Sequence, residues 1–249
     1  MNNDFKKQLI SIIGAKNLLL NDWEKKPFSN GWRYGTGTAL AVVKPGNLIE
    51  LWKVLELCVK NDLIIIMQAA NTGLTGGSTP YGNNYDREVI IINTLRIDKI
   101  HLLNNGNEIL ALAGSTLYDL EKKLLPLGRE PHSVIGSTSI GASIVGGVCN
   151  NSGGSLVKRG PAYTEMSLYA KIDKNGKLLL INDLDIDLGK SPEEILYNLE
   201  NECFGKKNFL KSKKVSSNET YEKLVRNVNS TKPARFNSDP KLLYGASGS

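Results

Sequence analysis

Cysteine and histidine are scarce in this chain of 249 residues, which contains three cysteines and two histidines. The cysteines, Cys58, Cys149 and Cys203, are odd in number and far apart, and no CxxC pair or Cys/His ligand spacing occurs. Such spacing argues against a disulfide framework and against a structural zinc site. A hydrophobic core must therefore stabilise the fold, and the apolar content of 41% is ordinary for a globular domain.

Long apolar segments are also missing. The strongest apolar run, residues 63–67, is far too short to span a bilayer, and residues 1–17 contain no apolar core of signal-peptide length. We therefore expect a cytoplasmic, reducing setting in which any membrane contact is peripheral. The net charge of +6 favours anionic partners, such as a phosphate-bearing cofactor, anionic lipid or nucleic acid, but a merely basic soluble surface explains it at least as well.

The sequence does contain an alternation of strand-like and helix-like patterns. A strand at 39–43, an amphipathic helix at 48–59 and a strand at 63–67 predict a βαβ unit with a parallel pair. The continuous apolar run at 63–67, with β-branched isoleucines at 64–66, is typical of a strand buried on both faces. The other expected elements are a helix at 4–13, a loop at 28–38, strands at 88–92, 97–103 and 108–113, a helix at 116–125, a hairpin of 167–172 with 177–181, and a helix that begins at Ser191.

A glycine-rich stretch, QAANTGLTGGST at residues 68–79, directly follows the strand at 63–67. Small residues let a ligand approach the backbone closely, and free N–H groups in such a loop form an anion nest that suits a pyrophosphate. The stretch lacks the Gly-Lys-Ser/Thr ending of a P-loop. An extended segment with Pro80 follows it, where a Rossmann fingerprint would open a helix. On its own, the stretch is also compatible with an ordinary turn.

A second region rich in small residues covers 132–155. It interleaves Ile144, Val145 and Val148 with its glycines, which flexible linkers seldom do. Two such segments, separated by strand-rich sequence, can line the two sides of one groove, whereas the alternative is a pair of unrelated flexible loops. The pattern favours a packed backbone that faces a ligand.

Four blocks of sequence carry a specific resemblance. They are AANTGLT at 69–75, GREPHSVIG at 128–136, GVCNNSGGSL at 147–156 and RGPAYTEM at 159–166. They resemble successive blocks of the quinone-dependent D-lactate dehydrogenase family, which are flavoproteins of the vanillyl-alcohol-oxidase (PCMH) type, and the match runs from about residue 35 to the end.

The resemblance implies an α+β fold: a two-subdomain FAD-binding domain of the PCMH type, with the cap domain truncated. It divides the chain into an N-terminal helical lead-in at 1–34, the FAD-binding domain at 35–206, and a basic and polar segment at 207–249 that begins the cap, or substrate, domain.

The resemblance also implies which residues contact FAD. A Cβ would push the backbone away from the phosphates at the glycines of this set. Asn71, Thr72, Ser78 and Ser143 can add side-chain hydrogen bonds. The implied cofactor-binding residues are Ala69, Ala70, Asn71, Thr72, Gly73, Gly77, Ser78, Gly136, Ser143 and Gly153.

The two histidines have more than one interpretation. His132 is a candidate for a covalent flavin link, because some relatives in the broader superfamily attach FAD through histidine. A hydrogen-bonded structural role is the expectation for both His132 and His101.

In the complete enzyme, the resemblance implies oxidation of D-lactate, or a similar small 2-hydroxy acid, to pyruvate by hydride transfer to FAD. Electrons then pass to quinone at the cytoplasmic side of the inner membrane, where the enzyme binds peripherally. The catalytic residues are not identifiable. Arg159 and Arg235 could attract a carboxylate, and ion pairing on the surface explains them equally well.

Two other functions stay open. The chain could be a non-catalytic remnant that binds FAD or another nucleotide without redox function. A nucleic-acid binder would rest only on the net charge and the lysine cluster at 206–214, where Phe209 is the only aromatic residue, so we expect no nucleic-acid partner. Because the cap is truncated, we expect 1–249 alone to oxidise little D-lactate.

Overall fold

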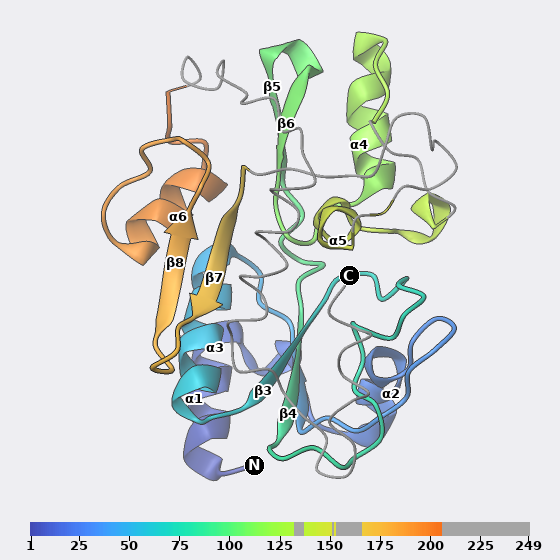
Figure 1. The fold of residues 1–249 in the computed structure, drawn as a ribbon, viewed down its shortest axis with the longest axis vertical. Helices are drawn as coiled ribbons and strands as arrows, with labels where there is room; N and C mark the ends of the chain where they lie inside the picture. Colours follow the sequence, from blue (N-terminus) through green and yellow to red (C-terminus); the bar gives the residue numbers. More distant parts are fainter. Residues whose placement is uncertain (132–136, 151, 153–165, 206–249) are drawn as a thin grey trace.

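The computed structural model describes residues 1–131, 137–150, 152 and 166–205, and Figure 1 shows how their elements are arranged. One end of the molecule contains a four-stranded, mainly parallel sheet, a two-stranded antiparallel hairpin lies toward the other end, and a second such hairpin lies along one side. Helices pack against the sheet and against the hairpins. The α+β class implied by the resemblance is confirmed.

The four-stranded sheet has the order β1-β2-β4-β3. Strand β1 (Leu18–Leu19) is antiparallel to β2 (Ala41–Val43), whereas β2 and β3 (Ile64–Gln68) both run parallel to β4 (Val89–Asn93). The predicted strand–helix–strand order is correct, and helix α3 (Leu48–Lys60) connects β2 to β3. The predicted pairing is wrong, because β4 lies between the two strands.

The burial of these strands also differs from the prediction. Strand β4 is buried on both faces, and Ile90, Ile91 and Ile92 are fully inaccessible. Among the described strands, β3 lies at the edge of the sheet and has β4 as its one neighbour, and Met67 is 44% exposed. The apolar run at 63–67 therefore forms an edge strand and not the central one.

Helices α1 and α3 cover one face of the sheet. Helix α1 (Asn3–Ile13) begins where the Asn2 side chain accepts a hydrogen bond from the Asp4 N–H. Its buried residues pack with those of α3 against Ile90 and Ile92 of β4. Ile91 points to the opposite face, as the two-residue period of a strand requires. Complete burial of each isoleucine contributes about 1.5–3 kcal/mol.

The hairpin toward the other end of the molecule consists of the antiparallel strands β5 (Ile100–Leu103) and β6 (Glu108–Ala111). Helix α4 (Leu117–Leu124) packs on this hairpin through leucines at helical spacing. Thr116 caps the helix by accepting a hydrogen bond from the Asp119 N–H, and the helix predicted at 116–125 is confirmed.

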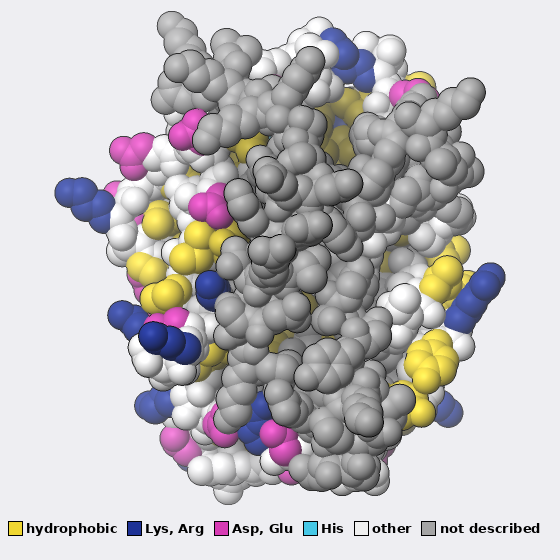
Figure 2. Space-filling view, viewed as in Figure 1, with side chains coloured by type: hydrophobic (Ala, Val, Ile, Leu, Met, Phe, Trp, Pro, Cys, Tyr) yellow, Lys and Arg dark blue, Asp and Glu magenta, His cyan; other side chains and the backbone are white. Residues whose placement is uncertain are grey.

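A second hairpin, β7 (Leu168–Ile172) with β8 (Leu178–Asn182), confirms the predicted pair. Helix α6 (Pro192–Glu200) follows it and is capped by Ser191, as expected. Leu168, Leu178 and Leu180 pack on the core beside α3 and α6. Hydrophobic side chains remain exposed on the outer side of this hairpin (Figure 2), including Tyr169 and Ile172.

One carboxylate connects α6 to α3. Glu200, buried near the end of α6, accepts a hydrogen bond of 2.8 Å from the backbone N–H of Leu48, the first residue of α3. Its other oxygen lies 3.5 Å from Lys99 Nζ. A negative charge at a helix N-terminus is favourable. The contact therefore stabilises the packing of α6 on α3, and it joins residues that are 152 positions apart.

Two helices were not predicted from the sequence. Helix α2 (Asp22–Ser29) contains Pro27 and extends into the start of the loop predicted at 28–38. The rest of that loop is irregular apart from isolated bridges of Asn30 with Thr36 and of Gly37 with Gly82. Helix α5 (Ile144–Cys149) lies inside the second region of small residues. Among the helices that the structure describes, none is long and apolar enough to cross a membrane.

We predict that Gly114→Ala destabilises the fold. Gly114 lies between β6 and α4, and a Cβ there would overlap the Thr94 carbonyl group and lie 2.7 Å from Leu95 Cα. Because these are backbone atoms, they cannot move aside cheaply, and we expect a loss of about 1–3 kcal/mol in the free energy of unfolding. Urea denaturation measures it.

Gly205→Ala is the matched control, because a Cβ at Gly205 would meet no atom within 4 Å. Equal midpoints for the two variants would contradict the packing described at Gly114.

Candidate FAD-binding site

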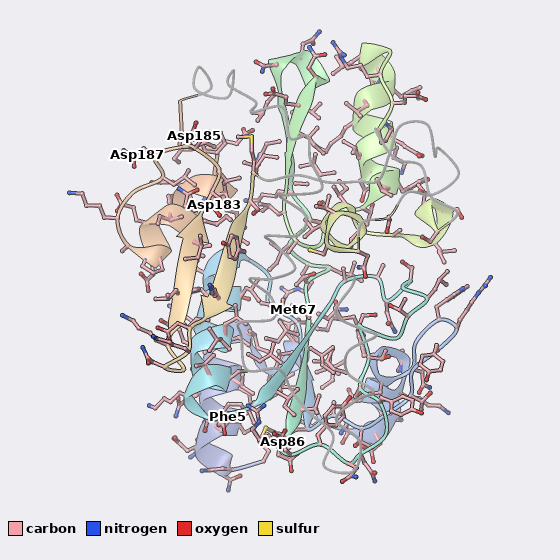
Figure 3. All side chains as sticks on the ribbon, viewed as in Figure 1. Phe5, Met67, Asp86, Asp183, Asp185 and Asp187 are labelled. Carbon is pink, nitrogen blue, oxygen red and sulfur yellow. The ribbon has the colours of Figure 1, made fainter. Side chains whose placement is uncertain are left out.

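The first glycine-rich segment leaves the carboxyl end of β3. Met67, labelled in Figure 3, is the last residue but one of β3, and residues 69–79 form an irregular loop after it. The chain leaves β4 at the neighbouring position, since Gln68 pairs with Asn93. In sheets with parallel strands, ligands bind outside such carboxyl ends.

Two buried amide side chains hold this loop to the sheet. Gln68, 2% exposed, donates through Nε2 to the Phe28 carbonyl at 2.8 Å and to the Ser78 carbonyl at 2.7 Å. Asn93, 1% exposed, donates through Nδ2 to the Ala69 carbonyl at 2.9 Å and to Gln68 Oε1 at 3.3 Å. Both ends of the loop are therefore anchored at the ends of β3 and β4.

A hydrogen bond between two side chains also joins the two halves of the loop. Asn71 has a φ of 55°, a conformation that asparagine tolerates better than most residues. Its Nδ2 donates to the Asn30 carbonyl at 2.7 Å, and its Oδ1 accepts from Ser78 Oγ at 2.8 Å. The side chains of Asn71 and Ser78, which the sequence suggests for cofactor contact, thus shape the loop.

Most backbone N–H groups of this loop have no acceptor within the protein. Among the described residues, none of the N–H groups from 70 to 78 donates a hydrogen bond to a protein acceptor. The same stretch contains no acidic side chain. A row of unpaired donors without a nearby carboxylate is the arrangement that binds a phosphate or pyrophosphate.

The second segment lies against the first. A Cβ built on Gly141 would be 4.0 Å from the Ala70 Cβ, so the turn at 137–142 is adjacent to the loop. Ser143 Oγ accepts a hydrogen bond from the Gly146 N–H at 3.1 Å, which caps α5. The two segments are therefore adjacent at Gly141 and Ala70, whereas the groove between them stays a prediction.

The predicted site residues fall into two groups. Seven lie on the loop after β3, namely Ala69, Ala70, Asn71, Thr72, Gly73, Gly77 and Ser78, and Ser143 lies at the start of α5. Gly136, Gly153, His132, Arg159, Arg235, the lysine cluster at 206–214 and the segment 207–249 lie outside the described residues.

His101 has a contact of the kind expected for a structural histidine. Its Nδ1 lies 2.9 Å from Glu202 Oε1, and burial lowers its pKa against the opposing effect of that carboxylate. Within the described part of the chain, no group of three or more His, Cys, Asp or Glu residues could hold a metal ion.

Two concavities lie away from the glycine-rich segments. One, of about 550 Å³, lies among α1, α3 and α6 and is lined by Ile12, Ile49 and Tyr197, among others. The other, of about 460 Å³, is lined by residues 38–40 and 83–89. Neither is lined by residues of the loop at 70–78, and we place the candidate site at the loop because of its consecutive free donors.

Comparison with known structures defines the class of protein. The fold is similar to that of p-cresol methylhydroxylase with substrate bound, with a TM-score of 0.54 and 15% identity over 72% of this chain and 35% of that one. At this identity the likeness shows the fold alone, which is that of the PCMH-type flavoproteins.

The sequence comparisons give the family. A family model described as "FAD binding domain" matches residues 39–180, which is more than half of the chain. The chain belongs to this family of FAD-binding domains, and its cofactor is FAD.

The chain is also similar to named enzymes. It is 54% identical to the quinone-dependent D-lactate dehydrogenase of Escherichia coli (strain K12) over 99% of this chain and 43% of that enzyme. For the Haemophilus influenzae enzyme of the same name, the identity is 52% over 97% of this chain and 43% of that enzyme. The resemblance found in the sequence is confirmed, and the chain spans less than half the length of these relatives.

We predict that Gly76→Ala weakens FAD binding. Gly76 has a φ of 77°, which costs an L residue about 1–2 kcal/mol, and a Cβ there would lie 3.0 Å from Cδ1 of Tyr34. The Tyr34 ring can give way, but the backbone strain at Gly76 remains, and we expect it to disturb the alignment of the N–H groups of the loop. A titration that follows quenching of flavin fluorescence measures the affinity.

Gly82→Ala is the control, because Gly82 has a similar φ of 63° but meets no atom within 4 Å and lies outside the loop. If both variants bound FAD with the same affinity, the loop at 70–78 would not be the phosphate site.

Proposed function

We propose that this chain is the cofactor-holding part of an FAD-dependent D-lactate dehydrogenase that delivers electrons to quinone. The observation that carries the proposal is the row of free N–H groups at 70–78, anchored at the ends of two parallel strands. The names of the relatives at 54% and 52% identity supply the substrate and the acceptor.

Some residues of the chain contact FAD, and others fix the conformation of the loop that binds it. The backbone of 69–73, with Gly77 and Ser78, cradles the FAD pyrophosphate, and Gly136, Ser143 and Gly153 add further cofactor contacts. Gln68 and Asn93 set the position of the loop without touching the cofactor. Asn71 and Ser78 keep the donors pre-aligned, so that little ordering is needed on binding.

Bound FAD supplies the hydride acceptor for oxidation of D-lactate to pyruvate. The catalytic base and the groups that hold the substrate carboxylate are assigned to the remaining part of a longer protein, because the relatives are more than twice as long as this chain. We propose residues 1–34 as a helical lead-in, 35–206 as the FAD-binding domain and 207–249 as the start of the cap.

The proposed setting is peripheral contact with the cytoplasmic side of the inner membrane, where quinone is available. The net charge of +6 supports attraction to an anionic lipid surface. The proposal includes no nucleic-acid partner.

We predict that the purified 249-residue chain binds FAD and shows flavin absorption bands, yet reduces an artificial dye only slowly with D-lactate. FAD titration and a dye-reduction assay, with FAD-saturated protein and L-lactate as the stereochemical control, measure the two properties. A chain that stays colourless with excess FAD would contradict the proposal. Rapid turnover would show that no further segment is needed for catalysis.

A further inference from the structure

A buried hydroxyl without a partner lies on the turn that precedes α5. Thr138 is 7% exposed, and its Oγ1 makes no hydrogen bond. Two other buried side-chain atoms share this property among the described residues, Trp52 Nε1 and His101 Nε2. Trp52 belongs to the core around α3 and α6, and His101 already contacts Glu202 through its other ring nitrogen. Thr138 alone belongs to a glycine-rich segment.

The burial on this turn is the reverse of what hydrophobicity favours. The short 3-10 turn Thr138–Ile140 buries its threonine, whereas Ile140 is 44% exposed. Exchanging these two environments would gain apolar burial and would free the hydroxyl for water. Positions that break such a local rule are expected at functional sites.

The turn has a fixed backbone and a fixed place. The Gly141 N–H donates to the Thr138 carbonyl at 3.1 Å, and the Ala142 N–H donates to the Ser137 carbonyl at 3.0 Å. Gly141 lies against Ala70 of the phosphate loop, so Thr138 is three residues from the contact between the two segments. The carbonyl of Thr138 accepts the first of these hydrogen bonds, whereas its side-chain hydroxyl is buried and has no partner.

We propose that the Thr138 hydroxyl forms a hydrogen bond with a polar atom of FAD and is a cofactor-binding residue that the resemblance does not assign. This inference rests on the proposed function. In the FAD-bound protein the hydroxyl gains the partner that it lacks in the protein alone, so the unfavourable burial becomes a contribution to affinity and selectivity.

The test compares Thr138→Val, which keeps the side-chain shape and removes the hydroxyl, with Thr138→Ser, which keeps the hydroxyl. For Thr138→Val we expect two effects of opposite direction. The dissociation constant of FAD rises about tenfold, equivalent to about 1.4 kcal/mol, and the thermal midpoint without FAD rises by about 2–4 °C because an unpaired polar group is removed. Thr138→Ser retains FAD affinity close to that of the unchanged chain.

Ser139→Ala is the matched control, because Ser139 is an exposed hydroxyl on the same turn and should change neither quantity. A Thr138→Val chain that melts lower without FAD would show that the hydroxyl has a partner within the protein, which overturns the inference. Unchanged FAD affinity of Thr138→Val, while the unchanged chain binds FAD, overturns this inference alone. Failure of the unchanged chain to bind FAD overturns the proposed function together with it.

Discussion

The hydrogen bonds of Gln68 and Asn93 are the constraint on which the candidate site depends. Both amides are buried at the ends of adjacent parallel strands, and together they fix the two ends of the loop at 69–78. An amide left unpaired in such surroundings costs about 1–3 kcal/mol, so the loop and the sheet stabilise each other. Thr94 extends the junction, because its hydroxyl lies 3.1 Å from the Ala113 carbonyl and 3.3 Å from the Gln68 carbonyl, and so connects the end of β3 to the chain that leads to α4.

This junction explains how an α+β fold can present many backbone donors without losing order. The sheet supplies rigidity through fully buried isoleucines on β4, and the loop needs no side chain of its own to bind phosphate. Small residues keep the N–H groups accessible, and the absence of acids from 70 to 78 avoids repulsion of an anion. The buried contacts of the sheet thus keep the N–H groups at 70–78 in positions where no protein acceptor reaches them.

Much of the fold could be predicted from local patterns. Helices α1, α3, α4 and α6 and the hairpin β7–β8 follow from hydrophobic spacing, capping residues and turn signals, which are all short-range properties. The pairing of the parallel strands could not be predicted from local patterns, because strand order depends on contacts between distant residues. An apolar run does not reveal whether a strand is central or at an edge, and β3 shows this error.

Local sequence explains why helices α2 and α5 were not predicted. Pro27 within α2 and Gly146 and Gly147 within α5 are poor helix formers, so tertiary packing and caps override propensity there.

The candidate site was only partly accessible from the sequence. Its two glycine-rich segments were identified from composition, and a physical role for each could be argued from the lack of side chains. The anchors Gln68 and Asn93 and the buried hydroxyl of Thr138 were not identified, because their significance lies in hydrogen bonds that are made, or left unmade, in three dimensions. Single polar residues beside apolar strands carry no distinguishing local signal.

The central claim is that the backbone donors from 70 to 78 bind the FAD phosphates. Hydrogen exchange of these amides, measured with and without FAD, tests it most directly. The account predicts fast exchange of these amides in the protein alone, since they have no protein acceptor, and strong slowing when FAD is bound. Tight FAD binding with unchanged exchange across 70–78, and slowing confined to other segments, would contradict it.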